Sequence, residues 1–429
     1  MQINRGMLQL KYGALQAGYW MAYCTIYTFA AVYLLEKGFE NSQVGIVIAL
    51  GNILGVIAQP LFASIADASG RLSLHKLTLL LAAAALMLRI AALVIPDLIL
   101  PVAVLFIVTD ALIQVLQPLV NSVSVYYVNR GVELNFGLAR GLGSVSYAVV
   151  SSTLGRLVER YHSMAVLVLG IVIMGMIVAV MWSLPEFPDE DAVSGDAETG
   201  LRDKAAAVGE NGAVSADAGK VLAAGESARG NFFLRYPRFF VAMVGFICLF
   251  TAHFMVNNFM IRIVEPLGGT AAQMGTAMAI SAVAEIPTMF LFARIVKRIP
   301  SGSLLKISAL FFTLKAAAYA VAVNMPMFYI AQTLQIGGFA LCVPASVYYV
   351  NEVMEEHDKF KGQAIMAAAN TLGGVMGSLL GGVFLDAVGI AWALRAGVMI
   401  SALGAVILLF FLTAGEKRSA ASMERATGS

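Results

Sequence analysis

The sequence predicts an all-α membrane protein, with twelve transmembrane helices in two pseudo-symmetric bundles of six. Hydrophobic residues make up 59% of the 429 residues and charged residues only 13%, whereas soluble domains carry about 25% charge. Apolar runs of the roughly 20 residues that span a bilayer recur along the whole chain. Short motifs also recur about half a chain apart, which predicts two related halves.

Two repeats indicate this internal duplication. The hexapeptide Ser-Val-Tyr-Tyr-Val-Asn occurs at 124–129 and again at 346–351, about half a chain later. The pattern Gln43-x-Gly45 returns at a similar offset as Gln273-x-Gly275. Paired halves built from apolar helices are typical of secondary transporters, which bind their substrate between the halves near the bilayer midplane. Polar residues in the middle of predicted helices are therefore the first candidates for a site.

The predicted spans fall into two sets of six on either side of a polar segment. Residues 1–185 form the first predicted bundle, 186–231 a cytoplasmic linker, and 232–429 the second bundle with a short tail. The linker is rich in Ala, Gly, Ser, Asp and Glu and has no periodicity, so we predict disorder there. The spans are predicted at 12–34, 43–66, 74–96, 99–128, 135–158, 163–184, 237–263, 271–296, 303–323, 326–351, 362–385 and 389–414.

The distribution of Lys and Arg predicts the orientation. With both termini inside, cytoplasmic segments carry 20 of the 28 basic residues, the opposite side carries 4, and 4 fall inside spans. Because cytoplasmic loops are enriched in Lys and Arg, we predict a multi-pass protein of the bacterial inner (plasma) membrane with cytoplasmic termini. The three cysteines lie far apart in apolar runs, which indicates inert thiols, and no cofactor is expected.

Five polar residues share one face of the fourth predicted span, at spacings of 4, 3, 4 and 3. Such a face avoids lipid, so it either lines a cavity or forms an interhelical hydrogen-bond seam. The five residues are Asp110, Gln114, Gln117, Asn121 and Ser124.

An aromatic face on the first predicted span has the same kind of spacing. Gln16, Trp20, Tyr23 and Tyr27 follow one another at intervals of 4, 3 and 4. The three rings either pack against neighbouring helices or stack on a sugar or a flat heterocycle.

The fifth predicted span carries Arg140, with Ser144 and Tyr147 on the same face. An arginine near a helix start can extend to the membrane interface. The neighbouring glycines Gly141 and Gly143 instead favour close helix packing.

Two charged residues lie in the middle of predicted spans of the second half. Glu285 precedes Pro287 in the eighth span, and Lys315 lies in the ninth. Ionisable groups at this depth are functional candidates, because desolvation favours their neutral forms. The alternative is a structural ion pair between them. Further cavity candidates are His253, Asn257, Gln332, Gln335, Ser346, Gln363 and Asn370.

The turn after the second span carries Asp67-x-x-Gly70-Arg71. Taken alone, this is a turn glycine with solvated charges. Together with the twelve-span plan it is similar to the loop motif of the major facilitator superfamily, and the resemblance covers the chain outside the linker. It implies that Asp67, Gly70 and Arg71 belong to a cytoplasmic gating latch. The equivalent loop of the second half, Lys297 to Gly302, departs from that motif.

Residues 135–143, Asn-Phe-Gly-Leu-Ala-Arg-Gly-Leu-Gly, resemble the start of the fifth helix in the lactose permease and its oligosaccharide, nucleoside and phenylpropionate relatives. In that group the arginine binds the sugar and an aromatic residue two turns later stacks on it. Arg140 and Tyr147 hold these positions. The resemblance also aligns Lys315 with a ninth-helix arginine and places Glu285 one turn after an eighth-helix glutamate.

This chain departs from that group at three positions. The tenth-helix His and Glu that serve proton coupling are Gln335 and Gly338 here, and the fourth-helix glutamate is Ser122. Proton coupling is therefore expected at Glu285 first and Asp110 second, with Lys315 beside them, and lactose is not a supported substrate.

We predict a secondary active transporter that couples uptake of a small hydroxylated solute, an oligosaccharide or nucleoside, to protons by alternating access. The alternatives are a symporter for an aromatic or carboxylate solute, a drug–proton antiporter, or a transporter-shaped receptor. An enzyme is not expected, since no nucleophile–base pair or metal cluster is evident. The expected partners are the solute, protons and the lipid bilayer, with neither nucleic acid nor an obligate protein partner. The residues predicted to bind solute are Arg140, Tyr147, Trp20, Tyr23, Gln114, Gln117, Asn121, Asn257 and Asn370.

Overall fold

A computed structural model describes residues 5–68, 73–186 and 232–412, and these residues form helices with no strand among them. The prediction of an all-α protein is therefore confirmed. The predicted linker from residue 187 onward, Gly70, Arg71 and the side chain of Asp67 lie outside the described residues.

Two sets of helices make up the described chain. The first set is α1 (Arg5–Tyr23), the π-helical turn η1 (Cys24–Thr28), α2 (Ala30–Glu36), α3 (Asn41–Ala68), α4 (Leu74–Val94), α5 (Ile99–Val128), α6 (Phe136–Tyr161) and α7 (Met164–Ser183). The second set is α10 (Phe232–Arg235), α11 (Pro237–Asn258), α12 (Met260–Val264), η3 (Glu265–Leu267), α13 (Ala271–Arg298), α14 (Ser301–Val321), α15 (Met325–Thr333), η4 (Leu334–Ile336), α16 (Phe339–Val353), η5 (Glu356–Asp358) and α17 (Lys359–Phe411).

Nine segments within the described ranges are long and apolar enough to cross a bilayer. One of them contains α17, in which two helices meet at Gly389, with φ 78° and ψ 176°. The 26-residue α6 and the run from α1 to α2 are also long enough to cross. Splitting α17 and adding these two gives twelve segments of membrane-crossing length among the described residues, which agrees with the prediction.

Three predicted spans are interrupted where the sequence indicated continuous helices. The first span breaks at Phe29 (φ −102°, ψ 13°) and the seventh at Phe259 (φ −116°, ψ 26°). These phenylalanines are separated by the same offset as the two Gln-x-Gly motifs, so both halves share the break. The tenth span is interrupted by the 3-10 turn η4, just before Gly337 and Gly338. Such interruptions free backbone groups that side chains can bind.

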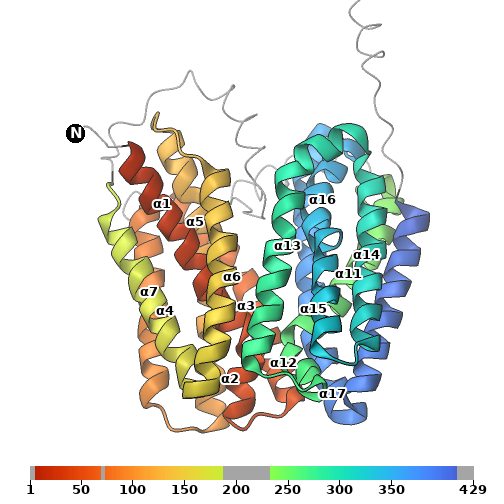
Figure 1. The fold of residues 1–429 in the computed structure, drawn as a ribbon. Helices are drawn as coiled ribbons and strands as arrows, with labels where there is room; N and C mark the ends of the chain where they lie inside the picture. The colour runs from red at the N-terminus through yellow and green to blue at the C-terminus, as the bar shows by residue number, and fades with distance from the viewer. Residues whose placement is uncertain (1–4, 69–72, 187–231, 413–429) are drawn as a thin grey trace, which may run out of the picture.

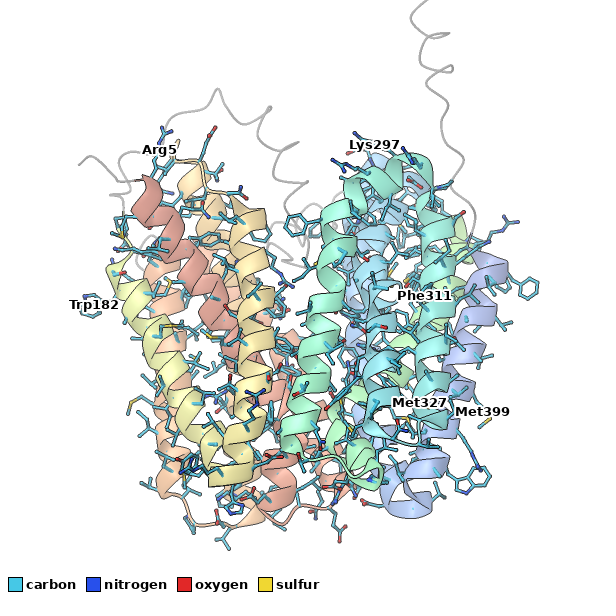
Figure 2. All side chains as sticks on the ribbon, viewed as in Figure 1. Arg5, Trp182, Lys297, Phe311, Met327 and Met399 are labelled. Atoms are coloured by element: carbon cyan, nitrogen blue, oxygen red, sulfur yellow. The ribbon has the colours of Figure 1, made fainter. Side chains whose placement is uncertain are left out.

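The helices gather into two groups that stand side by side (Figure 1), with α1 to α7 in one and α11 to α17 in the other. The groups meet where α6 packs against α13 and where α3 packs against α17. Trp182 and Met399 lie at the outer edges of the two groups (Figure 2) and are 79% and 63% exposed. Large apolar side chains exposed in this way suit a surface that faces lipid.

The hexapeptide repeat lies in equivalent places, at the end of α5 and within α16. Its second tyrosine is fully buried in both copies, as Tyr127 and Tyr349. The Tyr127 hydroxyl donates a hydrogen bond to the Pro185 carbonyl at 2.7 Å and lies 3.1 Å from Nε2 of His75. The repeat therefore packs the helix ends together, away from the mid-membrane polar residues.

Candidate functional site

Arg140 lies against the aromatic face of the first helix. Its guanidinium carbon is 3.9 Å from the centre of the Trp20 ring, and its NH1 donates to the Ser144 hydroxyl at 3.0 Å. Arginine stacks well on indole, because the ring face is electron-rich. Trp20, Tyr23 and Tyr27 continue as one array, with Tyr23 and Tyr27 stacked at 4.2 Å. The structure thus brings together residues that the sequence placed on two separate helices.

Gly143 permits this contact. A Cβ added there would lie 2.5 Å from Cδ1 of Trp20, whereas a Cβ at Gly141 would meet nothing within 4 Å. Both glycines are on α6, so only the packing against α1 distinguishes them.

This pair of glycines gives a matched prediction. Gly143→Ala should lower the free energy of unfolding by about 1–3 kcal/mol, because overpacking forces Trp20 to move. It should also change the emission spectrum of Trp20, measured after Trp182 and Trp392 are replaced by Phe. Gly141→Ala should leave the spectrum unchanged and stabilise the helix by about 0.5–1 kcal/mol. Equal effects of the two substitutions would contradict the Gly143–Trp20 contact.

Tyr147 lies deeper along the same helix. Its hydroxyl and that of Thr28 are 2.7 Å apart and share a hydrogen bond. Tyr147 and Arg140 therefore both face the first helix, as their shared helix face predicted.

The polar stripe on α5 divides into two parts. Gly51 and Gly55 of α3 make room for Asp110 and Gln114, since an added Cβ would lie 2.2 Å from Oδ2 of Asp110 and 2.7 Å from the Gln114 side chain. Gln114 Nε2 also donates to the Gly51 carbonyl at 3.2 Å. This part is an interhelical seam, and Asp110 is only 2% exposed.

The other part of the stripe faces α1. Asn121 Oδ1 accepts a hydrogen bond of 3.0 Å from Gln16 Nε2, which also donates to the Tyr12 hydroxyl at 2.8 Å. Gln117 is half-buried between the two parts.

In the second half, a glutamine joins the two predicted charges. Gln335 Nε2 donates to Glu285 Oε1 at 2.7 Å, and Lys315 Nζ donates to Gln335 Oε1. No direct ion pair between Lys315 and Glu285 is found among the described residues. The alternative of a structural Glu285–Lys315 ion pair is therefore wrong, because the Gln335 amide stands between the two groups.

Sequence reasoning noted Gln335 only as a cavity candidate and as the replacement of a proton-carrying histidine. Its role as a bridge was missed because it depends on the interruption at η4. Thr288 donates to the Ile336 carbonyl at 2.7 Å and Ser308 to the Gly338 carbonyl at 2.9 Å, so α13 and α14 both hold this turn.

His253 and Asn257 are joined by a hydrogen bond of 2.8 Å between Nε2 and Nδ2. The offset of the Gln-x-Gly repeat relates them to Tyr23 and Tyr27, so the same helix positions carry rings in one half and a His–Asn pair in the other. His253 stacks on Phe339 with ring centres 5.3 Å apart, and it lines a cavity of about 10 Å³ together with Lys315.

Asn370 of α17 is half-buried, and its Oδ1 accepts no hydrogen bond from the described residues. It is the one predicted solute-binding amide of the eleventh span, and its oxygen is buried in this conformation.

The two clusters face each other where the halves meet. Arg140 and Tyr147 lie on α6, and Gln335 links Glu285 of α13 to Lys315 of α14. Since α6 packs on α13, an arginine with an aromatic face opposes a carboxylate with an amide and an ammonium group. This arrangement suits binding of a hydroxylated or weakly acidic solute next to a group that can gain and lose a proton.

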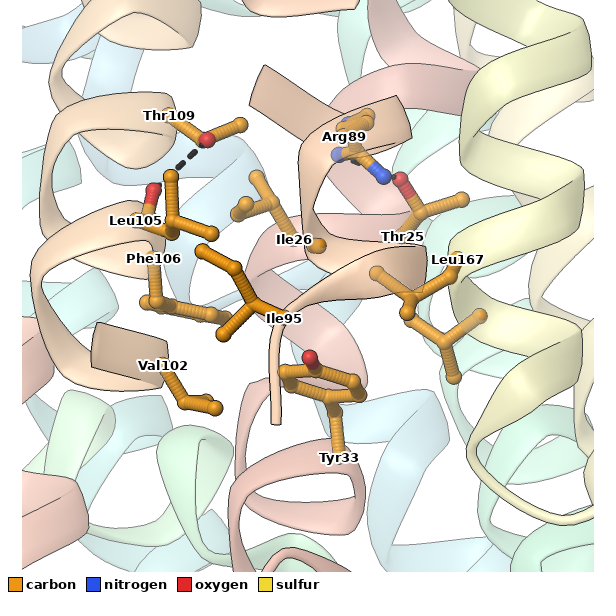
Figure 3. A pocket seen from close by; sticks show the side chains of 12 residues that line it. Thr25, Ile26, Tyr33, Arg89, Ile95, Val102, Leu105, Phe106, Thr109 and Leu167 are labelled. Carbon is orange, nitrogen blue, oxygen red and sulfur yellow. Dashed lines mark hydrogen bonds between the residues drawn. The ribbon is translucent and has the colours of Figure 1, made fainter. Parts of the chain in front are cut away.

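A separate cavity of about 30 Å³ lies inside the first half, around Arg89 (Figure 3). Arg89 is 3% exposed and donates from NH2 to the Thr25 hydroxyl at 2.9 Å. The other lining residues are mostly apolar, including Ile26 and Phe106. This volume holds about two water molecules, which is less than an organic solute occupies.

Comparison with known proteins identifies the family. Residues 14–396 match the sequence model of the MFS_1 like family. A Deinococcus radiodurans protein named "Putative sugar efflux transporter" is 31% identical over 145 residues, which is 33% of this chain. The match spans only 34%, about a third, of that relative's length.

Solved structures share the fold. The nucleoside transporter NupG has a TM-score of 0.73 at 15% identity and covers 96% of this chain and 100% of its own. A bacterial homologue of the human lysosomal transporter Spinster, in an inward-facing and unoccupied conformation, has a TM-score of 0.67 at 12% identity, with 96% and 98% covered. The peptide transporter POT in complex with alafosfalin has a TM-score of 0.65 at 11% identity, with 97% and 100% covered. The chain therefore belongs to the MFS_1 like family of the major facilitator superfamily, a family of membrane transporters.

Proposed function

We propose that the protein is a proton-coupled symporter that takes up a small hydroxylated solute, an oligosaccharide or a nucleoside, by alternating access. The observation that carries this proposal is the opposition of two clusters across the α6–α13 contact. Arg140 on Trp20 offers a charged fork beside an aromatic face, and the Glu285–Gln335–Lys315 chain offers a carboxylate held by an amide.

In this proposal the solute binds mainly to the first half. The Trp20, Tyr23 and Tyr147 rings provide stacking surface, and the Gln117, Asn121, Asn257 and Asn370 amides provide hydrogen bonds. Two bundles, 1–185 and 232–429, rock about this site in the plasma membrane, with both termini in the cytoplasm. Relatives named as nucleoside and sugar transporters support this class of solute.

Glu285 is the proposed proton carrier, and Gln335 sets its ionisation. Glu285 is half-buried and lies at the contact between the halves, whereas Asp110 is packed away behind Gly51. Protonation of Glu285 removes its negative charge before the bundles reorient, which lowers the cost of enclosing this side chain away from water.

Replacing Gln335 tests this arrangement. Gln335→Met keeps the volume between Glu285 and Lys315 but removes the donor to the carboxylate, which favours the protonated form. The pH of half-maximal uptake in reconstituted vesicles should therefore rise by about one unit, since a hydrogen bond to a charged group contributes about 1.5 kcal/mol. The matched control is Gln332→Met, also buried, because its Oε1 accepts from the Tyr319 hydroxyl instead. A pH profile that moves equally in both variants would remove Gln335 from the coupling site.

Export is the second candidate, because the Deinococcus radiodurans relative is named as an efflux transporter. A proton antiporter would use the same residues but expel the solute. Vesicles with an inside-alkaline gradient distinguish the two, since a symporter accumulates solute in them and an antiporter of the same orientation depletes it. A thermal-stability screen of the purified protein over sugars, nucleosides and aromatic acids identifies the solute class, because a ligand that binds the folded state raises Tm.

A further inference from the structure

Two seams join the halves on the membrane side opposite the N-terminus, at the bottom of Figure 1. In the first seam, the carboxylate of Asp386, a residue of α17, contacts the first turn of α3. Its Oδ1 accepts from Asn41 Nδ2 at 2.7 Å and its Oδ2 from the Ser42 backbone N–H at 2.6 Å. Arg262 Nε also donates to Asn41 Oδ1 at 3.0 Å. In the second seam, Glu159 of α6 accepts from the backbone N–H of Ala272, on the first turn of α13, at 3.4 Å.

Glycines bring the backbones into contact in both seams. A Cβ added to Gly45 would lie 2.2 Å from the Ser378 carbonyl oxygen, and one on Gly382 would lie 2.3 Å from the Asn41 carbonyl oxygen. The second seam repeats this pattern, with 2.0 Å from Gly275 to the Ser151 oxygen and 2.3 Å from Gly155 to the Ala271 oxygen. These approaches leave no room for a side chain, so each seam closes only when the helices are in register.

The two seams are copies of one design. Ser378, Gly382 and Asp386 have the same spacing of four as Ser151, Gly155 and Glu159, about half a chain earlier. Their partner helices, α3 and α13, each begin with one copy of the Gln-x-Gly repeat. The side chain of each glutamine accepts a hydrogen bond from the backbone N–H three residues earlier. Gln43 Oε1 accepts from Glu40 at 3.0 Å, and Gln273 Oε1 accepts from Thr270 at 2.8 Å. In each seam, the helix that carries the Gln-x-Gly repeat is therefore the one whose first turn binds the carboxylate.

We propose that Asp386 and Glu159 are a pair of positioning residues in the transport cycle, which latch this side of the transporter closed. The first turn of a helix has backbone N–H groups without intrahelical partners and a partial positive charge, so a carboxylate binds there favourably. The partner helix belongs to the other half, so both contacts exist only while the seams are closed. Opening this side separates α3 from α17 and α13 from α6 and exchanges both bonds for water.

The two latches contribute unequally. Asp386 accepts two short hydrogen bonds and its partner Asn41 is held by Arg262, whereas Glu159 accepts one long bond. Asp386 therefore sets most of the balance between the states open to opposite sides. This inference rests on membership of the transporter family and does not depend on the solute or on proton coupling.

Electron-spin distance measurements on the full-length purified protein in lipid nanodiscs test the latches. Spin labels on Met164→Cys and Val323→Cys, which are 47% and 77% exposed on this side in different halves, report the opening. All labelled variants are made in a protein whose three cysteines, Cys24, Cys248 and Cys342, are replaced by Ala, so that only the introduced cysteines carry labels. Asp386→Ala should raise the ratio of the long-distance to the short-distance population about tenfold, as expected for loss of a charge-assisted hydrogen bond. Glu159→Gln should shift the ratio in the same direction by less, and Asp386→Glu should restore the short distance in part.

The matched control is Glu36→Gln. Glu36 Oε2 accepts from the Ser163 backbone N–H at 2.8 Å, so it also caps a helix start, but within one half. This control should leave the distance distribution unchanged. Unchanged distributions in both Asp386→Ala and Glu159→Gln would overturn the proposal, and so would an equal shift in Glu36→Gln. If Asp386→Ala does not fold, the test is the comparison of the distance distributions of Glu159→Gln and Glu36→Gln, of which only the first should shift.

Discussion

Glu285→Gln is expected to abolish accumulation of solute against its gradient while solute exchange across the membrane continues. Glutamine keeps the volume and the hydrogen-bonding reach of the side chain but neither releases nor takes up a proton. The side chain at position 285 is then permanently uncharged, so the bundles reorient with or without a proton and the coupling is lost. Proteoliposomes with an imposed proton gradient measure accumulation, and counterflow of labelled solute in the same vesicles measures exchange.

Asp110→Asn is the matched control for this result. Asp110 is also a buried mid-membrane carboxylate that accepts from a glutamine, here Gln114 Nε2 at 3.5 Å. It is 2% exposed and packed against Gly51, within the first half. We expect Asp110→Asn to retain accumulation. The reverse pattern, with accumulation lost in Asp110→Asn and kept in Glu285→Gln, would make Asp110 the proton carrier.

Arg140→Ala is expected to weaken solute binding by roughly 10- to 100-fold, because a hydrogen bond from a charged group contributes about 1.5–3 kcal/mol. The substitution also removes the cation from the face of Trp20, so the ring loses the group that orients it. Arg140→Lys should give an intermediate affinity, since lysine keeps the charge but lacks the planar fork. Titration calorimetry with the solute found by the stability screen measures these affinities.

Arg156→Ala controls for the loss of a positive charge on the same helix. Arg156 lies on α6 beyond Tyr147, several turns after Arg140, and is exposed. Its removal should leave affinity unchanged. If Arg140→Ala binds as tightly as the unmodified protein, Arg140 does not belong to the solute site and the proposed function loses its main support.

The stacking of Arg140 on Trp20 shows how far helix periodicity reaches. Spacing alone put Trp20, Tyr23 and Tyr27 on one face and Arg140 with Tyr147 on another. The pairing of these two faces is a matter of helix packing, and the sequence signal for it was Gly143, which leaves space for the indole. The interpretation of Arg140 as a residue that extends to the interface was the alternative, and its contacts with Trp20 and Ser144 lie within the bundle instead.

Gln335 illustrates what periodicity missed. A continuous tenth helix was predicted, in which Gln332 and Gln335 are simply neighbours on one face. The η4 turn interrupts it, and the two amides then bind different partners, with Gln332 on Tyr319 and Gln335 on Glu285. The interruption leaves the carbonyl groups of Ile336 and Gly338 to be bound by side chains of other helices. Their donors, Thr288 of α13 and Ser308 of α14, are distant in the sequence, so periodicity along the tenth span does not indicate where the interruption falls.

The sequence by itself determined the membrane class, the number of spans and the internal duplication, because bilayer thickness and helix rise translate directly into runs of about 20 apolar residues. It also predicted which polar residues lie at mid-membrane. Only the tertiary structure decided which of them meet: that Gln335 separates Lys315 from Glu285, and that Asp110 is closed off behind Gly51. It also decided that the helix turns just before the two Gln-x-Gly motifs bind carboxylates from the other half. The physical reason is that these contacts join helices distant in the sequence, and their geometry is set by how closely the glycines let the backbones approach.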